Sequence, residues 1–263
     1  MALTLDLSGK KALVTGVTSG IGAAIAAMLA QAGCDVAGCG NTPADGDGAV
    51  AFKRAVEKCG RRADYRVADL SRPEAARAWV SEAVTASGGC DVLVSNAGRN
   101  IFEGVSACTE AAWHECMNLD LAAHWRVAQV ARPWLEQAAP GVVIVISSNH
   151  AYGTLPNCFP YNVAKAGLVA LVQSIALEWG PAVRAVGIAP GFIDTAGNDE
   201  WFASFSDPAA ERQRTEALHP VGRLGRPNEI AALCAFLATP WAGFINGTTL
   251  LVDGGRSARL QDE

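Results

Sequence analysis

The stretch KALVTGVTSGIGAAIAAMLAQA, residues 11–32, decides the fold predicted for this chain. It begins with a short run typical of a buried strand, continues through a glycine-rich turn, and ends in an alanine-rich helix. Gly16, Gly20 and Gly22 permit a tight turn and a close approach of the backbone to a ligand. The free N–H groups and the positive dipole at the start of the helix favour an anion such as a pyrophosphate. A plain strand-to-helix turn remains the alternative for this stretch on its own.

A second pattern, SSNHAYGTLPNCFPYNVAK at residues 147–165, combines a hydroxyl, a phenol and an ammonium group. Tyr161 and Lys165 stand four apart at the start of an apolar run, so on a helix they share one face. Ser148 follows a strand-like apolar run. A neighbouring ammonium favours the phenolate and lowers the pKa of a phenol. We therefore expect Tyr161 to act as a general acid or base, the alternative being an ordinary polar helix start.

These two patterns together resemble the short-chain dehydrogenase/reductase family. In that family a serine precedes Tyr-x-x-x-Lys by thirteen residues, and the glycine turn has the form Gly-x-x-x-Gly-x-Gly seen here after Thr15, in place of Gly-x-Gly-x-x-Gly. The resemblance implies that Ser148 holds the substrate oxygen and that Tyr161 exchanges the proton. It further implies that Lys165 lowers the pKa of Tyr161 and binds the nicotinamide ribose. The expected reaction is hydride transfer between nicotinamide and a secondary alcohol or ketone.

Composition limits the other classes of function. The chain has 263 residues, half of them hydrophobic, which suits a single domain over residues 1–263. With 21 basic and 26 acidic residues and no long basic run, we expect no nucleic-acid partner. We find no signal pattern and no membrane-length apolar run, and we expect a cytoplasmic protein without a membrane partner. The eight cysteines form no CxxC pair and no metal-ligand cluster, so we expect reduced thiols and no metal.

The alternation of apolar runs predicts an α/β fold, a Rossmann-type doubly wound parallel sheet of about seven strands with helices on both faces. The cofactor would cross the carboxyl ends at the switch point between the first and fourth strands. Strands are predicted at 11–15, 35–39, 64–67, 91–95, 142–146, 184–189 and 248–252, and helices at 21–32, 50–59, 73–86, 110–137, 164–177 and 228–238, with Pro133 as a kink or break.

The family resemblance also implies a set of cofactor contacts for NAD(H) or NADP(H). An acidic residue at Gly40 selects NAD in the family, whereas a basic residue at Asn41 or Ser19 pairs with the 2′-phosphate of NADP. This chain has none of the three, so we expect weak discrimination with a lean to NAD. Asp69 would contact the adenine, or alternatively cap the helix that follows. The full set carried over is Gly16, Ser19, Gly20, Ile21, Gly22, Gly40, Asn41, Asp69, Leu70, Asn96, Ala97, Gly98, Tyr161, Lys165, Pro190, Gly191, Ile193 and Thr195.

Two further positions carry family features. The sequence Asn96-Ala-Gly98 resembles the family's Asn-Asn-Ala-Gly motif, with Ser95 in the first place, whose hydroxyl can hydrogen-bond as well. Asn118 matches the fourth catalytic residue of the family, which positions a water that links the lysine to solvent. A solvated polar position on a helix is the alternative for Asn118.

The substrate class is predicted from the polar residues beside the catalytic motifs. Arg99, Asn100 and His150 would line the pocket, and buried polar groups without partners are costly, so a polyhydroxylated substrate fits better than an apolar one. Arg99 would pair with a carboxylate, which favours a sugar or sugar acid. Residues 32–36 also resemble the corresponding part of sugar-acid dehydrogenases. The alternatives are that Arg99 and His150 face solvent, a 3-oxoacyl thioester reductase such as the similar 3-oxoacyl-carrier-protein reductases, and a catalytically inactive dinucleotide-binding sensor.

The last expectation concerns the segment at about 196–220, which carries Trp201, Phe202 and Phe205. Its place after the Pro190-Gly191 loop resembles the position of the family's substrate-covering segment, and Trp201 is predicted to contact the substrate. A packed satellite helix is the alternative. The family further implies a homotetramer or homodimer, with a small-molecule alcohol or ketone as the other partner.

Overall fold

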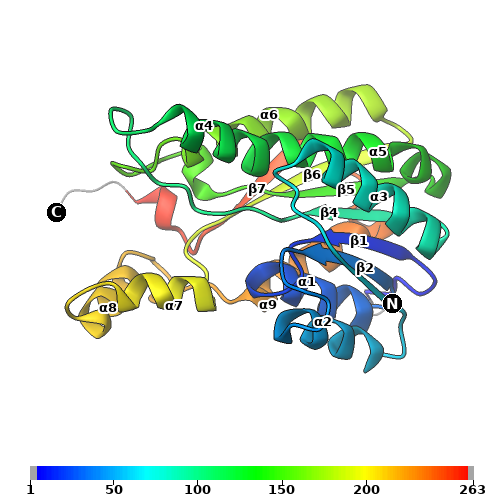
Figure 1. The fold of residues 1–263 in the computed structure, drawn as a ribbon, viewed down its shortest axis with the longest axis horizontal. Coiled ribbons are helices and arrows are strands. Elements are labelled where there is room, and N and C mark those ends of the chain that lie inside the picture. Colours follow the sequence, from blue (N-terminus) through cyan, green and yellow to red (C-terminus); the bar gives the residue numbers. More distant parts are fainter. Residues whose placement is uncertain (1–4, 260–263) are drawn as a thin grey trace.

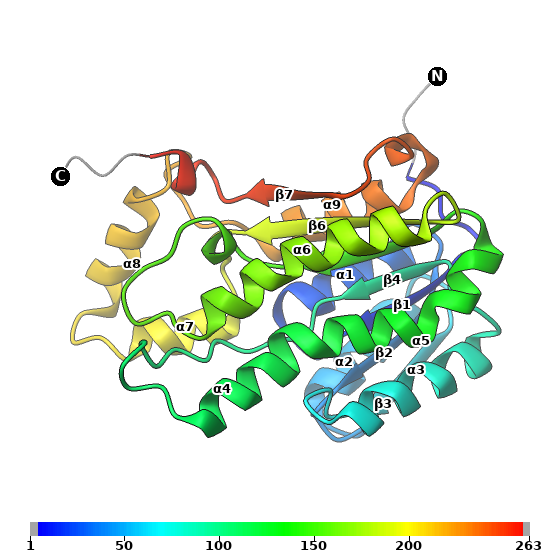
Figure 2. The same ribbon diagram turned by 90° about the horizontal axis from the view of Figure 1, so that it is seen from above.

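The computed structural model describes residues 5–259 and has one seven-stranded sheet at its centre (Figures 1 and 2). Every neighbouring pair of strands is parallel, and the strand order is β3-β2-β1-β4-β5-β6-β7. The predicted Rossmann-type doubly wound fold is therefore confirmed. The strands are β1 Lys11–Thr15, β2 Asp35–Gly40, β3 Ala63–Val67, β4 Val92–Ser95, β5 Gly141–Ile146, β6 Val183–Pro190 and β7 Thr248–Val252.

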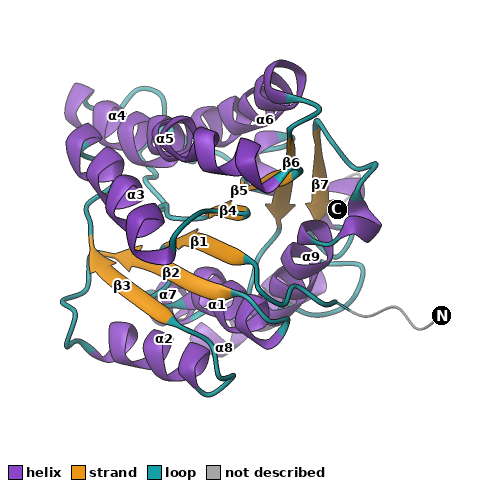
Figure 3. Cartoon of the chain, turned by 90° about the vertical axis from the view of Figure 1, so that its right-hand side faces the viewer, coloured by secondary structure: helices purple, strands orange, loops and turns teal. Residues whose placement is uncertain are grey.

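Helices cover both faces of this sheet, as the view along the strands shows (Figure 3). Helices α1, α2 and α9 lie on one face, and α3, α5 and α6 lie on the other, each layer with its own hydrophobic cluster. The helices are α1 Gly20–Gln31, α2 Asp47–Glu57, α3 Pro73–Ser87, α4 Glu110–Met117, α5 Ala123–Ala138, α6 Tyr161–Trp179, α7 Ala196–Ala203, α8 Pro208–Ala217 and α9 Pro227–Ala238, with shorter turns η1 Asn118–Ala122, η2 Asn149–Ala151, η3 Pro240–Ala242 and η4 Arg256–Ala258.

The strand sequences follow from this two-sided burial. Alternate residues of a strand point to opposite faces, so a strand covered on both faces is apolar throughout. In β1, Ala12 and Val14 pack against α1, α2 and α9, whereas Leu13 packs against the opposite layer. All residues of β5, GVVIVI, are buried, whereas β7 at the edge of the sheet is partly exposed. The apolar run of β5 therefore carries Ser148 directly to the edge where the strands end.

One predicted element is wrong in detail. The sequence predicted a continuous helix from 110 to 137, but the structure has α4, then a π-helical turn η1 over Asn118–Ala122, then α5. Pro133 neither ends nor interrupts α5. Pro133 is exposed, so the carbonyl that loses its N–H partner can be hydrated. Other predicted boundaries differ by up to three residues, which is the usual uncertainty at element ends.

The start of α1 approaches the end of β1 very closely at Gly22. A Cβ added to Gly22 would overlap the carbonyl oxygen of Gly16 and lie 2.5 Å from the side-chain nitrogen of Asn96. Asn96 holds this corner together, because its side-chain amide donates to the carbonyl oxygens of Thr15 and Gly16. The glycine turn and the end of β4 are thus locked together at the switch point.

We predict that Gly22→Ala lowers the free energy of unfolding by about 1–3 kcal/mol, because the new methyl group must displace backbone atoms. Gly197→Ala is the matched control, since that glycine also lies in a helix and a Cβ there meets no atom within 4 Å. The control should be unchanged or slightly more stable. Urea-induced unfolding measures both, and a Gly22→Ala protein as stable as the control would contradict the close approach.

Candidate active site

A cavity of about 1380 Å³ runs along the carboxyl ends of the strands, from the glycine turn to the C-terminal residues of the described chain. The strands β1, β2, β4, β5 and β6 all end at this edge, so the loops that follow them form its walls. Nearly all the site residues predicted from sequence line it: Gly16, Ser19, Gly20, Ile21, Gly22, Gly40, Asn41, Leu70, Asn96, Ala97, Gly98, Arg99, Asn100, Ser148, His150, Tyr161, Lys165, Pro190, Gly191, Ile193, Thr195 and Trp201. Asp69 and Asn118 are the two that do not.

Ser148, Tyr161 and Lys165 meet at the end of β5 and the first turn of α6. Tyr161 is the first residue of α6, and Lys165, one turn later, places its ammonium 5.4 Å from the centre of the phenol ring. Lys165 is 4% exposed, and the Ser147 hydroxyl donates to its backbone carbonyl at 2.8 Å. Ser148 caps η2 by accepting from the N–H of His150. Three of the four side chains predicted to be catalytic therefore lie together in the cavity.

The electrostatics of Tyr161 differ from the expectation. Burial raises the pKa of the Tyr161 phenol, and this outweighs the lowering by Lys165 and by a hydrogen bond with Ser148. The negative charge of Asp120 acts in the same direction as burial and also raises the pKa of Tyr161. The lowering by Lys165 is present as predicted, but the sequence pattern gave no sign of these opposing contributions.

Asp120 is a site residue that the sequence analysis missed. Its carboxylate is fully buried and lies 3.5 Å from the Lys165 ammonium. It also accepts the backbone N–H of Arg99 at 3.0 Å, and a Cβ on Gly98 would come within 2.5 Å of it. Burial raises the pKa of Asp120, opposed first by Lys165. The sequence places the carboxylate of Asp120 two residues after Asn118. The π-helical turn that directs this carboxylate inward has no recognisable sequence signature.

Asn118 begins the same π-helical turn, η1, and its side chain points to Arg126. The Asn118 side-chain oxygen accepts from Arg126 at 3.0 Å, and the Asn118 backbone carbonyl accepts from the same guanidinium at 3.4 Å. Asn118 is thus held on the element that carries Asp120 while its own side chain is engaged outside the cavity. Its role in proton relay stays a prediction.

The residues of the glycine turn fit a dinucleotide. Ser19, the N-cap of α1, makes no side-chain cap, so the N–H groups of the first helical turn have no side-chain acceptor. Thr15 holds the facing strand end by accepting the backbone N–H groups of Asn96 and Ala97. On the far side, the Thr195 side chain lies 3.4 Å from where a Cβ on Gly20 would be. This glycine cradle has room for a pyrophosphate against a helix N-terminus.

The end of the cavity at β2 lacks charge. Gly40 and Asn41 line it, and Tyr65 donates to the carbonyl of Thr42 beside them. Asp69 points elsewhere: its carboxylate accepts from the backbone N–H and the hydroxyl of Ser71. In the described chain this region contains neither the carboxylate nor the cation by which the family separates NAD from NADP.

The predicted substrate residues are divided between the cavity wall and its rim. The ring of His150 lies 5.9 Å from that of Tyr161, and Phe102 lies 5.2 Å from the same ring. Burial first, and Arg256 second, lower the pKa of His150. Arg99 lines the rim, but its guanidinium is already paired with Glu115. The predicted pairing of Arg99 with a substrate carboxylate would therefore compete with an existing ion pair.

The segment at 196–220 forms two helices, α7 and α8 (Figure 2), and residues of both line the cavity. Trp201 of α7 packs against Phe192, Phe202 and Phe205 with ring centres 4.7 to 5.4 Å apart. Phe202 is buried, whereas Trp201 is 37% exposed and lines the cavity. The segment thus has one buried aromatic side chain, Phe202, and one that faces the cavity, Trp201.

Ser95, which stands where the family motif has its first asparagine, makes a side-chain hydrogen bond within the core. Its hydroxyl and Nδ1 of His124 on α5 are 2.8 Å apart, and both residues are buried. Burial lowers the pKa of His124 to about 3, so this histidine is neutral. The pair therefore joins β4 to α5. The resemblance to the family motif gave no indication that these two side chains are in contact.

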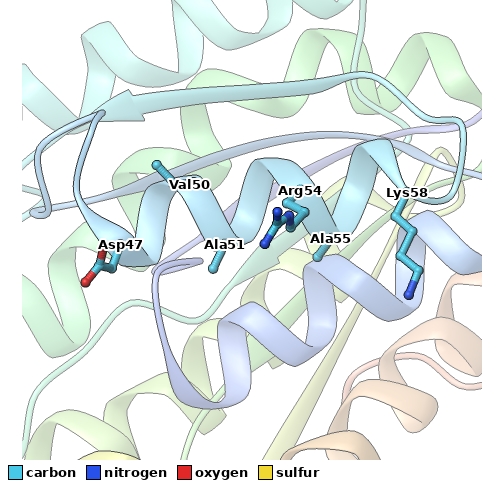
Figure 4. Close-up of a pocket in the computed structure, with 6 residues that line it drawn as sticks. All are labelled: Asp47, Val50, Ala51, Arg54, Ala55 and Lys58. Carbon is cyan, nitrogen blue, oxygen red and sulfur yellow. The ribbon is translucent and has the colours of Figure 1, made fainter.

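Outside this cavity, residues 5–259 offer little for chemistry. All eight cysteines are free, and no group of three or more potential ligands is placed to hold a metal. In this part of the chain, no helix is both long and apolar enough to cross a membrane. A hollow on α2 is lined by five residues of that helix, including Asp47 and Arg54, and by Lys58, which follows its last residue (Figure 4). No second element supplies side chains that converge on a ligand there.

Comparison with known proteins agrees with this geometry. A family model described as enoyl-(acyl carrier protein) reductase matches residues 16–257. The chain is 36% identical over 252 residues to 3beta-hydroxysteroid dehydrogenase 1 of Eggerthella lenta, covering 95% of this chain and 94% of that one.

Two solved structures are similar over nearly their whole length. A short-chain dehydrogenase/reductase from Serratia marcescens has a TM-score of 0.87 and 31% identity, covering 95% of this chain and 99% of the other. Aldohexose dehydrogenase from Thermoplasma acidophilum has a TM-score of 0.89 and 27% identity, covering 99% of both. The chain belongs to the short-chain dehydrogenase/reductase family and is an NAD(P)-dependent oxidoreductase that acts on CH–OH groups.

Proposed function

We propose that Ser148, Tyr161 and Lys165 carry out this reaction on a polar substrate, a sugar or sugar acid. The observation that carries the catalytic part is the meeting of these three side chains in the cavity that also contains the glycine cradle. Nicotinamide supplies the hydride chemistry when bound, and the protein supplies orientation and proton transfer. The cofactor would lie along the glycine turn, Asn96 to Gly98, and Pro190 to Thr195.

The proposed division of roles follows from each side chain's position. The Ser148 hydroxyl holds the substrate oxygen beside Tyr161, which takes up or releases the proton at that oxygen. Lys165 stabilises the phenolate, and its contribution opposes the burial that raises the pKa of Tyr161. The buried carboxylate of Asp120 fixes the ammonium from the other side. Proton transfer by Tyr161 therefore depends on the balance between Lys165 and Asp120.

A polar substrate is supported by the side chains near Tyr161. His150, Asn100 and Asn157 present hydrogen-bonding groups to the cavity, while Phe102 and Trp201 offer ring faces on which the C–H faces of a sugar can stack. A steroid or long acyl chain would leave several of these polar groups without partners, at about 1–3 kcal/mol each. The aldohexose dehydrogenase with the same fold supports the same substrate class. A 3-oxoacyl thioester, the runner-up class, is supported by a 35% identity over 258 residues to a 3-oxoacyl-(acyl-carrier-protein) reductase of Vibrio cholerae.

A second copy of the chain is a further proposed partner, in a dimer or tetramer. Leu177 on α6 is 84% exposed, and Phe244 next to the edge strand β7 is fully exposed. Apolar surface that is contiguous and exposed in one copy of a chain marks a site of contact with another protein. The proposal rests on these two exposed side chains and on the fact that members of the family commonly form oligomers.

We predict that wild-type protein oxidises or reduces sugars or sugar acids faster than acetoacetyl thioesters. Tyr161→Phe should lose nearly all turnover while cofactor affinity stays within a few-fold, because only the phenolic oxygen is removed. The measurement is a steady-state panel of aldoses, aldonates, keto-deoxy acids and acetoacetyl thioesters with NAD(H) and NADP(H), with cofactor titration of both proteins. Faster thioester turnover would reject the sugar class. More than about a tenth of the rate in Tyr161→Phe would reject the role of Tyr161.

We predict that Asp120→Asn moves the acidic limb of the pH profile for alcohol oxidation to lower pH. The negative charge of Asp120 raises the pKa of Tyr161, so its removal lowers that pKa and the phenolate forms at lower pH. The measurement is kcat/KM for oxidation from about pH 5 to 10, which reports groups of the free enzyme. Glu110→Gln, an exposed carboxylate on α4, is the control and should leave the limb in place. A limb that stays or moves to higher pH would contradict the assignment.

We propose that the chain discriminates weakly between the two cofactors, with a lean to NAD, and we predict that Asn41→Arg reverses the lean. The cavity wall at Asn41 is exposed and uncharged, so an arginine there can reach a 2′-phosphate without displacing neighbours. The ratio of kcat/KM for NADP to that for NAD should rise about tenfold or more, since a charge-assisted hydrogen bond contributes about 1.5–3 kcal/mol. Asn41→Gln adds length without charge and should leave the ratio unchanged. A strong NADP preference in the wild type would overturn the proposal.

A further inference from the structure

Within residues 5–259, the lining of the active-site cavity contains five cationic side chains and no carboxylate, although the whole chain has a net charge of -5. The five are Lys165, Arg99, Arg214, Arg256 and Arg259. Lys165 lies beside the proposed reaction centre, Arg99 at the rim, and the other three at the mouth formed by α8 and η4. The cations at the mouth need not serve the cofactor, because the glycine cradle would hold the pyrophosphate with backbone N–H groups and the helix dipole and without a cation.

Four of these five cations already have a partner within residues 5–259. Lys165 lies beside Asp120, Arg99 pairs with Glu115, and Arg214 makes two hydrogen bonds to Glu211 at 2.6 and 2.9 Å. Arg259 donates to the backbone carbonyl of Ala217 at 3.2 Å. Arg256 has no hydrogen bond and no ion pair through its guanidinium in this part of the chain.

Arg256 is nevertheless held in a defined position. It begins η4, the short helical turn that follows Asp253, and its backbone N–H donates to the carbonyl of Asp253. The Asp253 carboxylate is buried and accepts the N–H groups of Gly255 and Ser257, so both of its oxygens are engaged by the backbone. Asp253 therefore fixes the turn and leaves the half-buried Arg256 guanidinium without a hydrogen-bonded counter-charge.

The position of Arg256 connects the mouth of the cavity to Tyr161. Its charge contributes to the lowered pKa of His150, whose ring lies 5.9 Å from that of Tyr161. Two hydrogen bonds join the end of α8 and the residues after it to the segment that contains η4. The N–H of Val221 donates to the carbonyl of Gly254, and Arg259 donates to the carbonyl of Ala217, so α8 and η4 lie side by side. Tyr161, His150 and Arg256 line the same cavity, so a substrate that reacts at Tyr161 and extends past His150 toward the mouth can reach Arg256.

We propose that Arg256 binds a carboxylate at the end of the substrate away from the reacting carbon, which makes the substrate a sugar acid. A half-buried guanidinium close to other cations gains from a carboxylate, with which it forms paired charge-assisted hydrogen bonds. Arg99, which the sequence suggested for this role, is paired with Glu115 instead. The inference rests on the proposed function, because it takes the substrate to react at Tyr161.

The test compares binding of D-gluconate with that of D-glucitol, a neutral polyol of the same carbon number. Calorimetric titration of the full chain with saturating NADH avoids turnover, because the reduced cofactor cannot accept a hydride. Wild type should bind gluconate at least about tenfold more tightly than glucitol. Arg256→Gln should weaken gluconate binding by about 10–100-fold and leave glucitol binding unchanged, as expected for loss of hydrogen bonds to a charged group.

Arg259→Gln and Arg99→Gln are matched controls, since each removes a neighbouring cation of the same cavity, and both should bind gluconate within about threefold of wild type. Equal or absent binding of gluconate and glucitol by the wild type would overturn the inference, as would dependence on Arg99 instead of Arg256. Tighter binding of glucitol 6-phosphate than of gluconate would show that the site selects a phosphate and not a carboxylate, and would also overturn the inference. Arg256-dependent gluconate binding without turnover of any sugar acid would leave this subsite standing while the proposed function fails.

Discussion

The close contact between the glycine turn and the end of β4 is the constraint on which the site depends. Helix α1 can start directly behind β1 only because Gly22 leaves room for the carbonyl of Gly16, and Asn96 then joins both segments by hydrogen bonds. Because neighbouring strands are parallel, β2, β5 and β6 end at the same edge of the sheet as β1 and β4. The dinucleotide cradle and the catalytic side chains are therefore consequences of one packing arrangement at the switch point.

Sequence patterns predicted the fold because the buried strands leave few alternatives. Runs such as VVIV in β5 have no polar face and suit a sheet covered on both sides, and the glycine turn sets the direction of the first strand–helix unit. The convergence of Ser148, Tyr161 and Lys165 was also predictable. Helical spacing places Tyr161 and Lys165 on one face, and the strand preceding Ser148 ends at the same edge of the sheet.

Other features depended on contacts between distant segments, which a single sequence does not show. The π-helical turn at Asn118 has no local sequence signature, yet it directs Asp120 against Lys165 and turns Asn118 toward Arg126. The pairing of Arg99 with Glu115 required the approach of the loop after β4 to α4. The net effect on the pKa of Tyr161 required the burial of the phenol, which spacing alone does not give.

The distribution of charge connects these observations. Although the chain has more acidic than basic residues, the cavity lining within residues 5–259 contains no carboxylate, and the buried Asp120 lies behind the lining residues Lys165, Gly98 and Arg99. Both the pyrophosphate of the cofactor and an acidic substrate are anions, and a carboxylate in the wall would repel each of them. Cations whose donors already bind a carboxylate or a backbone carbonyl have fewer donors free for a substrate, so the selection of an anionic substrate falls to the cation whose guanidinium has neither kind of partner. In the described chain that cation is Arg256, at the mouth of the cavity and on the substrate side of Tyr161, where it can select the substrate without competing with the glycine cradle for the cofactor.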